Sequence, residues 1–232
     1  MTRVLITVLA FGLLFGGATT IDGLDGGERR PLDLPSGGAG DGEDDEDAPE
    51  VISFYGAEYE ADAFFWVIDR SGSMLGEPMT VLKFELTEVL RQLTYRAEFG
   101  MVSFATEYTI FASRPIRATR SNKARGAIWV NELIADGWTC MPDPAAEIFN
   151  IANQCRKRNR VVIMVGDGVP RCMVYDNVES DLVLEAIAGA NYKRTKVNTI
   201  FIAGDPASQI LGISLYTEIA HRNRGTVMIV QK

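Results

Sequence analysis

The sequence predicts a doubly wound α/β fold, with a mostly parallel sheet between two layers of helices. Three largely apolar runs, at residues 63–68, 160–165 and 197–203, have the composition of strands that are buried on both faces. Segments with helical spacing of apolar residues separate these runs, and such alternation of strand and helix favours a parallel sheet. In sheets of this kind, ligands bind beyond the carboxyl ends of the strands.

The first half of the predicted domain adds two helices and a hairpin. Pro78 should lie in the first turn of a helix, because apolar residues follow it at helical spacing at Leu82, Leu86, Val89 and Leu93. Residues 100–104 and 108–111 are short strand-like runs, and the three residues between them favour a hairpin. We expect residues 122–134 to form the second helix.

The second half continues the alternation of helix and strand. Asp143 followed by Pro144 predicts the N-cap and the first residue of a helix. We expect two more helices at residues 178–190 and 209–222, and a last strand at residues 226–230.

The first 18 residues have the pattern of an export signal. Arg3 supplies a positive start, residues 4–15 are almost entirely apolar, and small residues follow at 16–18. An apolar run of this length is shorter than the roughly 20 residues that a bilayer-spanning helix needs. We therefore expect residues 1–18 to be a signal peptide, with an uncleaved membrane anchor as the alternative. Either reading predicts an extracytoplasmic protein: secreted, periplasmic or anchored outward.

An acidic segment follows at residues 19–58. The chain of 232 residues has a formal net charge of −8. Eleven acidic residues and two arginines give residues 22–50 a charge of −9, whereas residues 51–232 hold 20 acidic and 20 basic residues. A stretch so rich in like charges, glycine and proline buries too little apolar surface to fold. We expect residues 19–58 to be a disordered linker and residues 59–232 to be the folded domain.

Composition excludes several classes of site. The acidic balance argues against nucleic acid as a partner, because contacts to phosphates need clustered Lys and Arg. One histidine cannot build a multi-histidine zinc site, and three cysteines are too few for a four-cysteine module. No glycine-rich dinucleotide motif follows a predicted strand.

Carboxylates and hydroxyls follow the predicted strands, at the edge where ligands are expected. Three of them alternate along the turn after the first buried strand, one follows a later buried strand, and one lies on a loop between the two. All are hard oxygen donors, which suit Mg²⁺, Mn²⁺ or Ca²⁺. The set comprises Asp69, Ser71, Ser73, Thr139 and Asp167.

This pattern of Asp-x-Ser-x-Ser, a later Thr and a strand ending in Gly-Asp-Gly resembles the metal-ion-dependent adhesion site of von Willebrand factor type A (VWA) domains. The resemblance covers about residues 62–232, and all five ligand positions match. It implies a six-stranded sheet with five parallel strands and one antiparallel edge strand at residues 108–111. Two positions depart from the family pattern: Gly166 replaces a common Thr or Ser, and Trp138 replaces a common Gly.

The resemblance also implies a role for each ligand. Ser71, Ser73 and Thr139 would bind the ion directly, and Asp69 and Asp167 would complete the site directly or through water. An acidic group of a partner protein would take the open position. The residues expected at the rim, where they would add apolar contact, are Met74, Leu75, Trp138 and Met141.

The cysteines allow one disulfide. Cys140 follows the metal-loop threonine and Cys172 lies five residues after Asp167, so both loops should approach the same ion. Export to an oxidising compartment would permit a Cys140–Cys172 bridge, and two free thiols are the alternative. Cys155 is expected to be a buried thiol.

These features predict an exported, non-enzymatic module that binds a protein through a divalent cation, with no nucleic acid partner. Contact with a membrane would involve only an uncleaved N-terminal segment. One alternative is a structural component of an extracytoplasmic assembly. A metal-assisted hydrolase is a weaker alternative, because Ser71 lacks the Gly-x-Ser-x-Gly turn and a nearby histidine base.

Overall fold

A computed structural model of the chain describes residues 48–172, 180–204 and 206–231. The expected export signal and the expected linker up to residue 47 lie outside the described residues. Within the described ranges, no helix combines the length and the apolar character needed to cross a membrane.

The central sheet has the strand order β5-β4-β3-β7-β8-β9. Five neighbouring strands run parallel, and β5 pairs antiparallel with β4 at one edge. This confirms the predicted doubly wound fold with an antiparallel edge strand. The strands are β3 (Ala63–Asp69), β4 (Glu98–Phe104), β5 (Tyr108–Ile110), β7 (Arg160–Gly166), β8 (Lys196–Ala203) and β9 (Val227–Gln231).

One further strand was not expected from the sequence. The two-residue strand β6 (Ile116–Arg117) pairs antiparallel with the start of β4, beside β5. A strand of two residues is too short to show a periodic pattern, so sequence reasoning had no signal for it.

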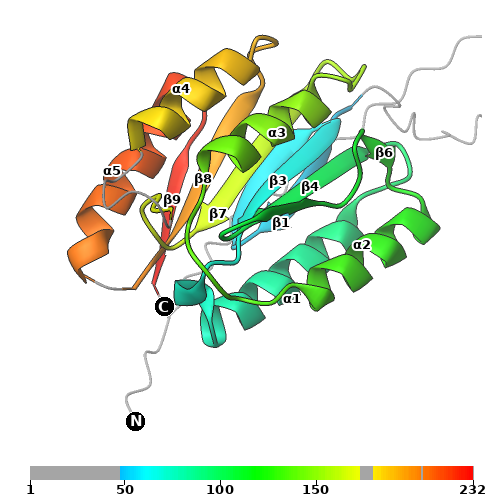
Figure 1. Cartoon of the computed structure of the whole chain (residues 1–232). Helices are drawn as coiled ribbons and strands as arrows, with labels where there is room; N and C mark the ends of the chain where they lie inside the picture. The colour runs from blue at the N-terminus through cyan, green and yellow to red at the C-terminus, as the bar shows by residue number, and fades with distance from the viewer. Residues whose placement is uncertain (1–47, 173–179, 205, 232) are drawn as a thin grey trace, which may run out of the picture. The chain divides into compact units, whose positions relative to one another are not determined.

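Helices cover both faces of the sheet (Figure 1). On one face lie α1 (Glu77–Gln92) and α2 (Arg120–Glu132), and their apolar residues share a core with one side of the sheet. The other face carries α3 (Pro142–Ala152), α4 (Ser180–Ala190) and α5 (Pro206–Arg222). A short 3₁₀ turn, Gly72–Met74, joins β3 to α1.

Strand β3 shows why the sheet lies in the middle of the domain. All seven of its residues are buried. Phe64, Trp66 and Ile68 pack into the core beneath α1 and α2, while Phe65 and Val67 pack into the core beneath α3, α4 and α5. Side chains of a strand alternate between faces, so a run that is apolar at every position needs cover on both sides.

Helix α3 begins earlier than predicted. Its N-cap is Met141 and its first residue is Pro142, so Asp143 lies in the first turn and is not the cap. Two prolines near the start are compatible with this register, because the first turn needs no backbone N–H donors. The carboxylate of Asp143 still lies at the positive end of the helix dipole.

The expected linker extends too far into the domain. Residues 50–58 do not form a linker, because β1 (Glu50–Phe54) and β2 (Ala57–Ala61) make an antiparallel hairpin. Ile52, Phe54 and Tyr59 are buried against the core of the α1 side. Their alternation with polar residues is a strand pattern, which the acidic composition of the segment concealed.

The hairpin turn has a clear local cause. Tyr55 and Gly56 both have left-handed φ values, 52° and 78°. Two-residue hairpin turns of the primed type require positive φ at both central positions, and glycine adopts it without strain. The folded domain therefore begins before Glu50, whose carboxylate accepts a 2.9 Å hydrogen bond from the Thr94 backbone N–H.

We predict that Gly225→Ala destabilises the domain severely. A methyl group on Gly225 would overlap the backbone carbonyl of Val197, at the start of β8. The expected loss is at least about 2 kcal/mol of unfolding free energy, measured by urea denaturation.

Gly189→Ala is the matched control. A methyl group there meets no atom within 4 Å, and Gly189 lies in helix α4. Alanine should stabilise the helix by up to about 1 kcal/mol. Equal unfolding free energies for the two variants would contradict this account of the β8–β9 packing.

Candidate functional site

The sheet topology brings the predicted ligands together. Strands β3 and β7 are parallel neighbours, and Ile68 pairs with Val165 in their register. Asp69 therefore lies beside Gly166 at the carboxyl edge of the sheet. The loop that follows β3 is joined to the loop before α3 by a 3.0 Å hydrogen bond from the Gly72 N–H to the Gly137 carbonyl.

Hydrogen bonds connect the first loop to both carboxylates. The backbone N–H of Ser71 donates to Asp69 Oδ1 at 2.8 Å. The hydroxyl of Ser73 donates to Asp167 Oδ1 at 2.6 Å, and it lies 3.2 Å from the hydroxyl of Ser71. Four of the five predicted ligands thus form one connected cluster.

Thr139 joins this cluster from the loop before α3. Its backbone exchanges two hydrogen bonds of 2.9 Å with Arg171, so the loop is paired with the segment that follows Asp167. A methyl group built on Gly168 would lie 3.6 Å from Thr139 Oγ1 and 4.0 Å from Ser73 Oγ. Thr139 therefore lies near the other four candidate ligands at the carboxyl end of the sheet.

The site buries two carboxylates away from solvent. Asp69 is fully buried, and Asp167 is only 4% exposed. Burial is the main cause that raises the pKa of Asp69 to about 7; the negative charge of Asp167 acts in the same direction, and hydrogen bonds from Ser71 and from the Asp167 backbone oppose the shift. Two neighbouring carboxylates repel each other unless a proton or a cation lies between them.

The residues present fit a hard divalent cation. Asp69 Oδ2 is buried and has no hydrogen-bond partner among the described residues. Hydroxyl and carboxylate oxygens are the donors that Mg²⁺, Mn²⁺ and Ca²⁺ accept. In the described part of the chain, no three His, Cys, Asp or Glu side chains gather as a zinc site would require.

Tyr216 is a member of the site that sequence reasoning missed. This residue of α5 is 1% exposed, and its hydroxyl occupies the space that any side chain at Gly166 would enter. The same methyl group would lie 2.6 Å from Asp69 Cβ. Burial, followed by the charges of Asp69 and Asp167, raises the Tyr216 pKa well above its usual value, so the phenol stays protonated. The sequence signal for this contact was Gly166 itself: a glycine at a position where the family often has Thr or Ser leaves space for another side chain.

Comparisons with known proteins give the fold. No protein-family model matches this chain. One curated relative, inter alpha-trypsin inhibitor heavy chain 4 of Mus musculus, is 26% identical over 112 residues, which are 45% of this chain and 12% of that protein.

Solved structures are similar over most of the domain. A von Willebrand factor type A structure from Catenulispora acidiphila superposes with a TM-score of 0.58 at 18% identity, over 81% of this chain and 47% of that chain. The vWF domain of the type V pili tip protein Mfa5 from Porphyromonas gingivalis gives a TM-score of 0.58 at 11% identity, over 78% and 90% of the chains. This chain has the VWA fold. It spans about half the length of the first structure and a small part of the curated relative.

For two of the four residues expected at the exposed rim of the site, the prediction is wrong. Met74 and Met141 are fully buried, and each packs into one of the two cores. Leu75 is 73% exposed and Trp138 is 45% exposed, so only these two present apolar surface. Met74 is the last residue of the 3₁₀ turn and lies on its buried side, whereas Leu75 is the capping residue that follows the turn.

The three cysteines form one disulfide and one buried thiol. The structure pairs Cys140 with Cys172 in a disulfide, with 4.8 Å between their Cα atoms. Cys155 is a buried free thiol that donates to Glu98 Oε2 at 3.1 Å. Burial, followed by the hydrogen bond to Glu98, raises the Cys155 pKa to about 12, so this thiol is unreactive.

We predict that the metal-free protein loses stability as pH rises from about 4 to about 7. In this window the unfolded chain releases the Asp69 proton, while the folded chain, with a pKa of about 7, retains it. The unfolding free energy should fall by a few kcal/mol, on the order of 1.4 kcal/mol per unit of pKa. Urea denaturation in EDTA across this pH range measures it.

Asp69→Asn isolates the contribution of this carboxylate. Asparagine cannot ionise, so its unfolding free energy should be flatter over the same window and higher than that of the unaltered protein near pH 7. Curves that stay parallel at all pH values would show that Asp69 ionises normally in the fold.

Thiol counting tests the disulfide. The chain has three cysteines. Reaction with a thiol reagent should detect about zero thiols in the native protein, about one after denaturation, and about three after reduction and denaturation. Detection of three thiols in denatured, unreduced protein purified from an oxidising compartment would contradict the Cys140–Cys172 pair.

Proposed function

We propose that this chain is an extracytoplasmic, non-enzymatic protein-binding module that works through a divalent cation. The observation that carries the proposal is the buried Asp69 carboxylate, which lies beside Asp167 and has one oxygen without a hydrogen-bond partner in the described ranges of the chain. A cation would remove the repulsion between the two carboxylates and supply the partner for that oxygen.

Each ligand would have a distinct part. The hydroxyls of Ser71, Ser73 and Thr139 would bind the cation, and Asp69 and Asp167 would hold it directly or through water. Because this set offers five oxygen ligands and Mg²⁺ takes six, one coordination position would stay open for a further carboxylate. An Asp or Glu of the partner would complete the coordination.

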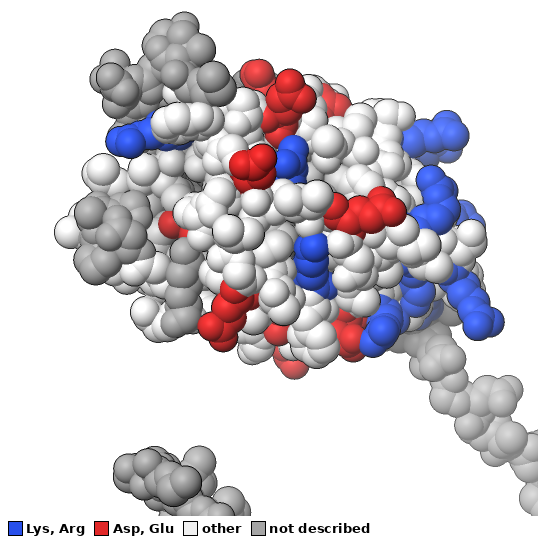
Figure 2. Space-filling model, turned by 60° about the horizontal axis from the view of Figure 1, so that its bottom comes forward, with Lys and Arg blue, Asp and Glu red and all other residues white. Residues whose placement is uncertain are grey.

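The surface around the site suits a protein partner. Leu75 and Trp138 are exposed apolar residues on the loops that carry the ligands. Figure 2 shows wide uncharged areas between the Asp and Glu side chains, with Lys and Arg gathered toward one side. A neutral surface with an aromatic residue and a central charge is typical of protein interfaces.

Similar structures favour a role in binding or assembly. One of them is the tip protein of a type V pilus, which acts outside the cytoplasm. The apolar N-terminal run and the Cys140–Cys172 pair favour the same location for this chain. Service in an extracytoplasmic assembly is therefore the second candidate, and it would use the same cation site.

The geometry gives little support to a hydrolase. The one histidine of the chain, His221, is exposed at the end of α5, near the opposite edge of the sheet. Ser71 has no histidine base, so its hydroxyl has a ligand's role and not a nucleophile's.

Calorimetric titration with Mg²⁺, Mn²⁺ and Ca²⁺ tests the cation site. The unaltered protein should bind at least one of them, and Asp69→Asn should weaken binding by about 100-fold or more, because it removes a buried charged ligand. Asp181→Asn, at an exposed position in the first turn of α4, is the matched control and should bind normally.

Partner capture tests the protein-binding role. Immobilised protein should retain a partner from envelope or culture fractions in the presence of the cation, and release it in EDTA. Asp69→Asn should retain none, whereas Asp181→Asn should behave as the unaltered protein. A partner that stays bound in EDTA would refute bridging through the cation.

A further inference from the structure

A cluster of basic side chains lies at the opposite edge of the sheet. The loops that precede β7, β8 and β9, together with the residues that flank them, hold nine Lys and Arg residues and no Asp or Glu. The proposed cation site follows the other ends of these strands, roughly 20 Å away along seven residues of strand. The nine residues are Arg156, Lys157, Arg158, Arg160, Lys193, Arg194, Lys196, Arg222 and Arg224.

Six of these cations line a single cavity of about 240 Å³. No acidic residue is among its described lining, which adds only Asn159 and Thr195. The basic members are Arg158, Arg160, Lys193, Arg194, Lys196 and Arg224. Gathering six like charges in one lining that has no acidic residue among its described members costs free energy that a bound anion would recover.

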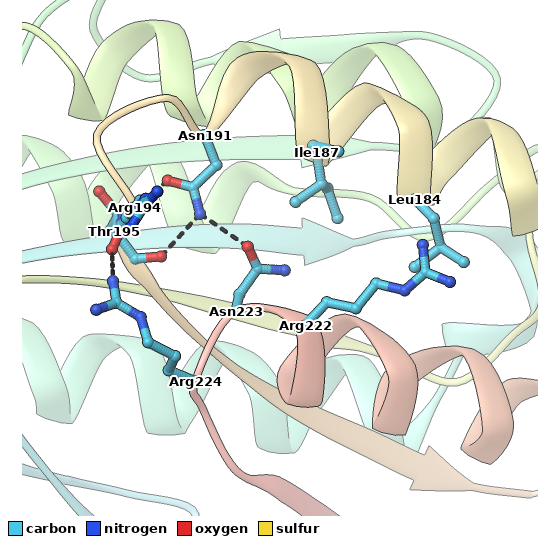
Figure 3. Close-up of a pocket in the computed structure, with 9 residues that line it drawn as sticks. Leu184, Ile187, Asn191, Arg194, Thr195, Arg222, Asn223 and Arg224 are labelled. Atoms are coloured by element: carbon cyan, nitrogen blue, oxygen red, sulfur yellow. Dashed lines mark hydrogen bonds between the residues drawn. The ribbon is translucent and has the colours of Figure 1, made fainter.

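A second cavity of about 360 Å³ adjoins the first and shares Arg194, Thr195 and Arg224 with it. It lies between α4 and the end of α5, and Figure 3 shows Leu184 and Ile187 reaching into it from α4. Leu184 and Ile187 therefore supply apolar surface on the α4 side of this cavity, where Arg222 also lies, and the side that it shares with the first cavity is cationic.

Two buried donors in the lining lack acceptors. Thr195 is 3% exposed, and its hydroxyl has no hydrogen-bond partner among the described residues. The Nε of Arg160 is also buried without a partner in this part of the chain. Buried polar groups are nearly always paired, so these two donors have unused hydrogen-bonding capacity next to the cavity.

The loops around the cavity are fixed before any ligand arrives. Asn191 Nδ2 donates to the Thr195 carbonyl and to Asn223 Oδ1, both at 2.8 Å (Figure 3). The guanidinium of Arg224 donates to the Arg194 carbonyl. This network holds the loops before β8 and β9 together, so binding would order little additional chain.

We infer that this cavity binds a multiply charged oxyanion, such as the phosphate group of a phosphate ester. Such a group supplies several acceptor oxygens for guanidinium and hydroxyl donors, and its charge offsets the six cations. The apolar side of the adjoining cavity would take a carbon chain or ring attached to that group. The inference does not depend on the cation site at the other edge.

Inorganic phosphate is the probe for the test. It is titrated into the full-length protein in EDTA, and amide resonances are followed by NMR. We expect saturable shifts at Arg160, Thr195 and Lys196, which weaken as salt is added. The double variant Arg158→Gln/Lys196→Gln should bind at least about tenfold more weakly, because it removes two exposed cations of the cavity.

Arg114→Gln/Arg120→Gln is the matched control. It removes the same charge from exposed positions that do not line the cavity, and it should bind phosphate normally. Thr195→Val should raise the dissociation constant a few-fold without lowering the melting temperature, because the lost hydroxyl has no hydrogen-bond partner among the described residues. An absence of saturable shifts, or equal weakening in both double variants, would overturn the inference.

Vesicles distinguish a lipid headgroup from a free phosphate ester. Sedimentation with phosphatidylcholine vesicles, with and without phosphatidylglycerol, is compared between the unaltered protein and Arg158→Gln/Lys196→Gln. Binding that needs phosphatidylglycerol and is lost in the variant identifies a lipid headgroup. Phosphate binding without such vesicle binding identifies a free ester.

Discussion

The repulsion between two carboxylates at the end of a parallel sheet is the constraint on which the site depends. Asp69 and Asp167 follow neighbouring strands, so the register of β3 and β7 fixes their proximity. Burial removes the water that would screen them, and the pKa of Asp69 rises as a result. The fold maintains this unfavourable arrangement through its two cores, which need β3 and β7 in the middle of the sheet.

The loops around the carboxylates are connected by backbone hydrogen bonds. Gly72 donates to Gly137, and Thr139 exchanges two bonds with Arg171, so each ligand-bearing loop supports the next. Tyr216 adds a contribution from α5, because its phenol fills the space beside Asp69 that Gly166 leaves open. A change in the position of α5 would therefore alter the packing next to a ligand of the proposed cation. The site is thus coupled to the helical layer as well as to the strands.

The two edges of the sheet have opposite electrostatic character. The carboxyl edge holds buried acids, and the other edge holds six cations around one cavity. Because residues 51–232 have no net charge, this separation is invisible in the composition. The acidic overall composition does not prevent a local cluster of Lys and Arg, because the crossover connections gather three basic loops in one place. A module with a cation at one edge and an anion at the other could engage two ligands independently.

Periodicity in the sequence predicted the order of strands and helices, because buried strands and amphipathic helices need apolar residues at fixed spacings. The five candidate ligands came from polar residues at the ends of predicted strands, and the antiparallel edge strand came from the resemblance to VWA domains. The sequence-based prediction failed at the β1–β2 hairpin, where the acidic composition masked the strand pattern. It also failed for Met74 and Met141, because their burial depends on how their loops pack against the two cores. Only the tertiary structure placed Tyr216 against Gly166 and joined the basic loops around Thr195. Contacts between residues far apart in the chain follow from packing, which no local pattern encodes.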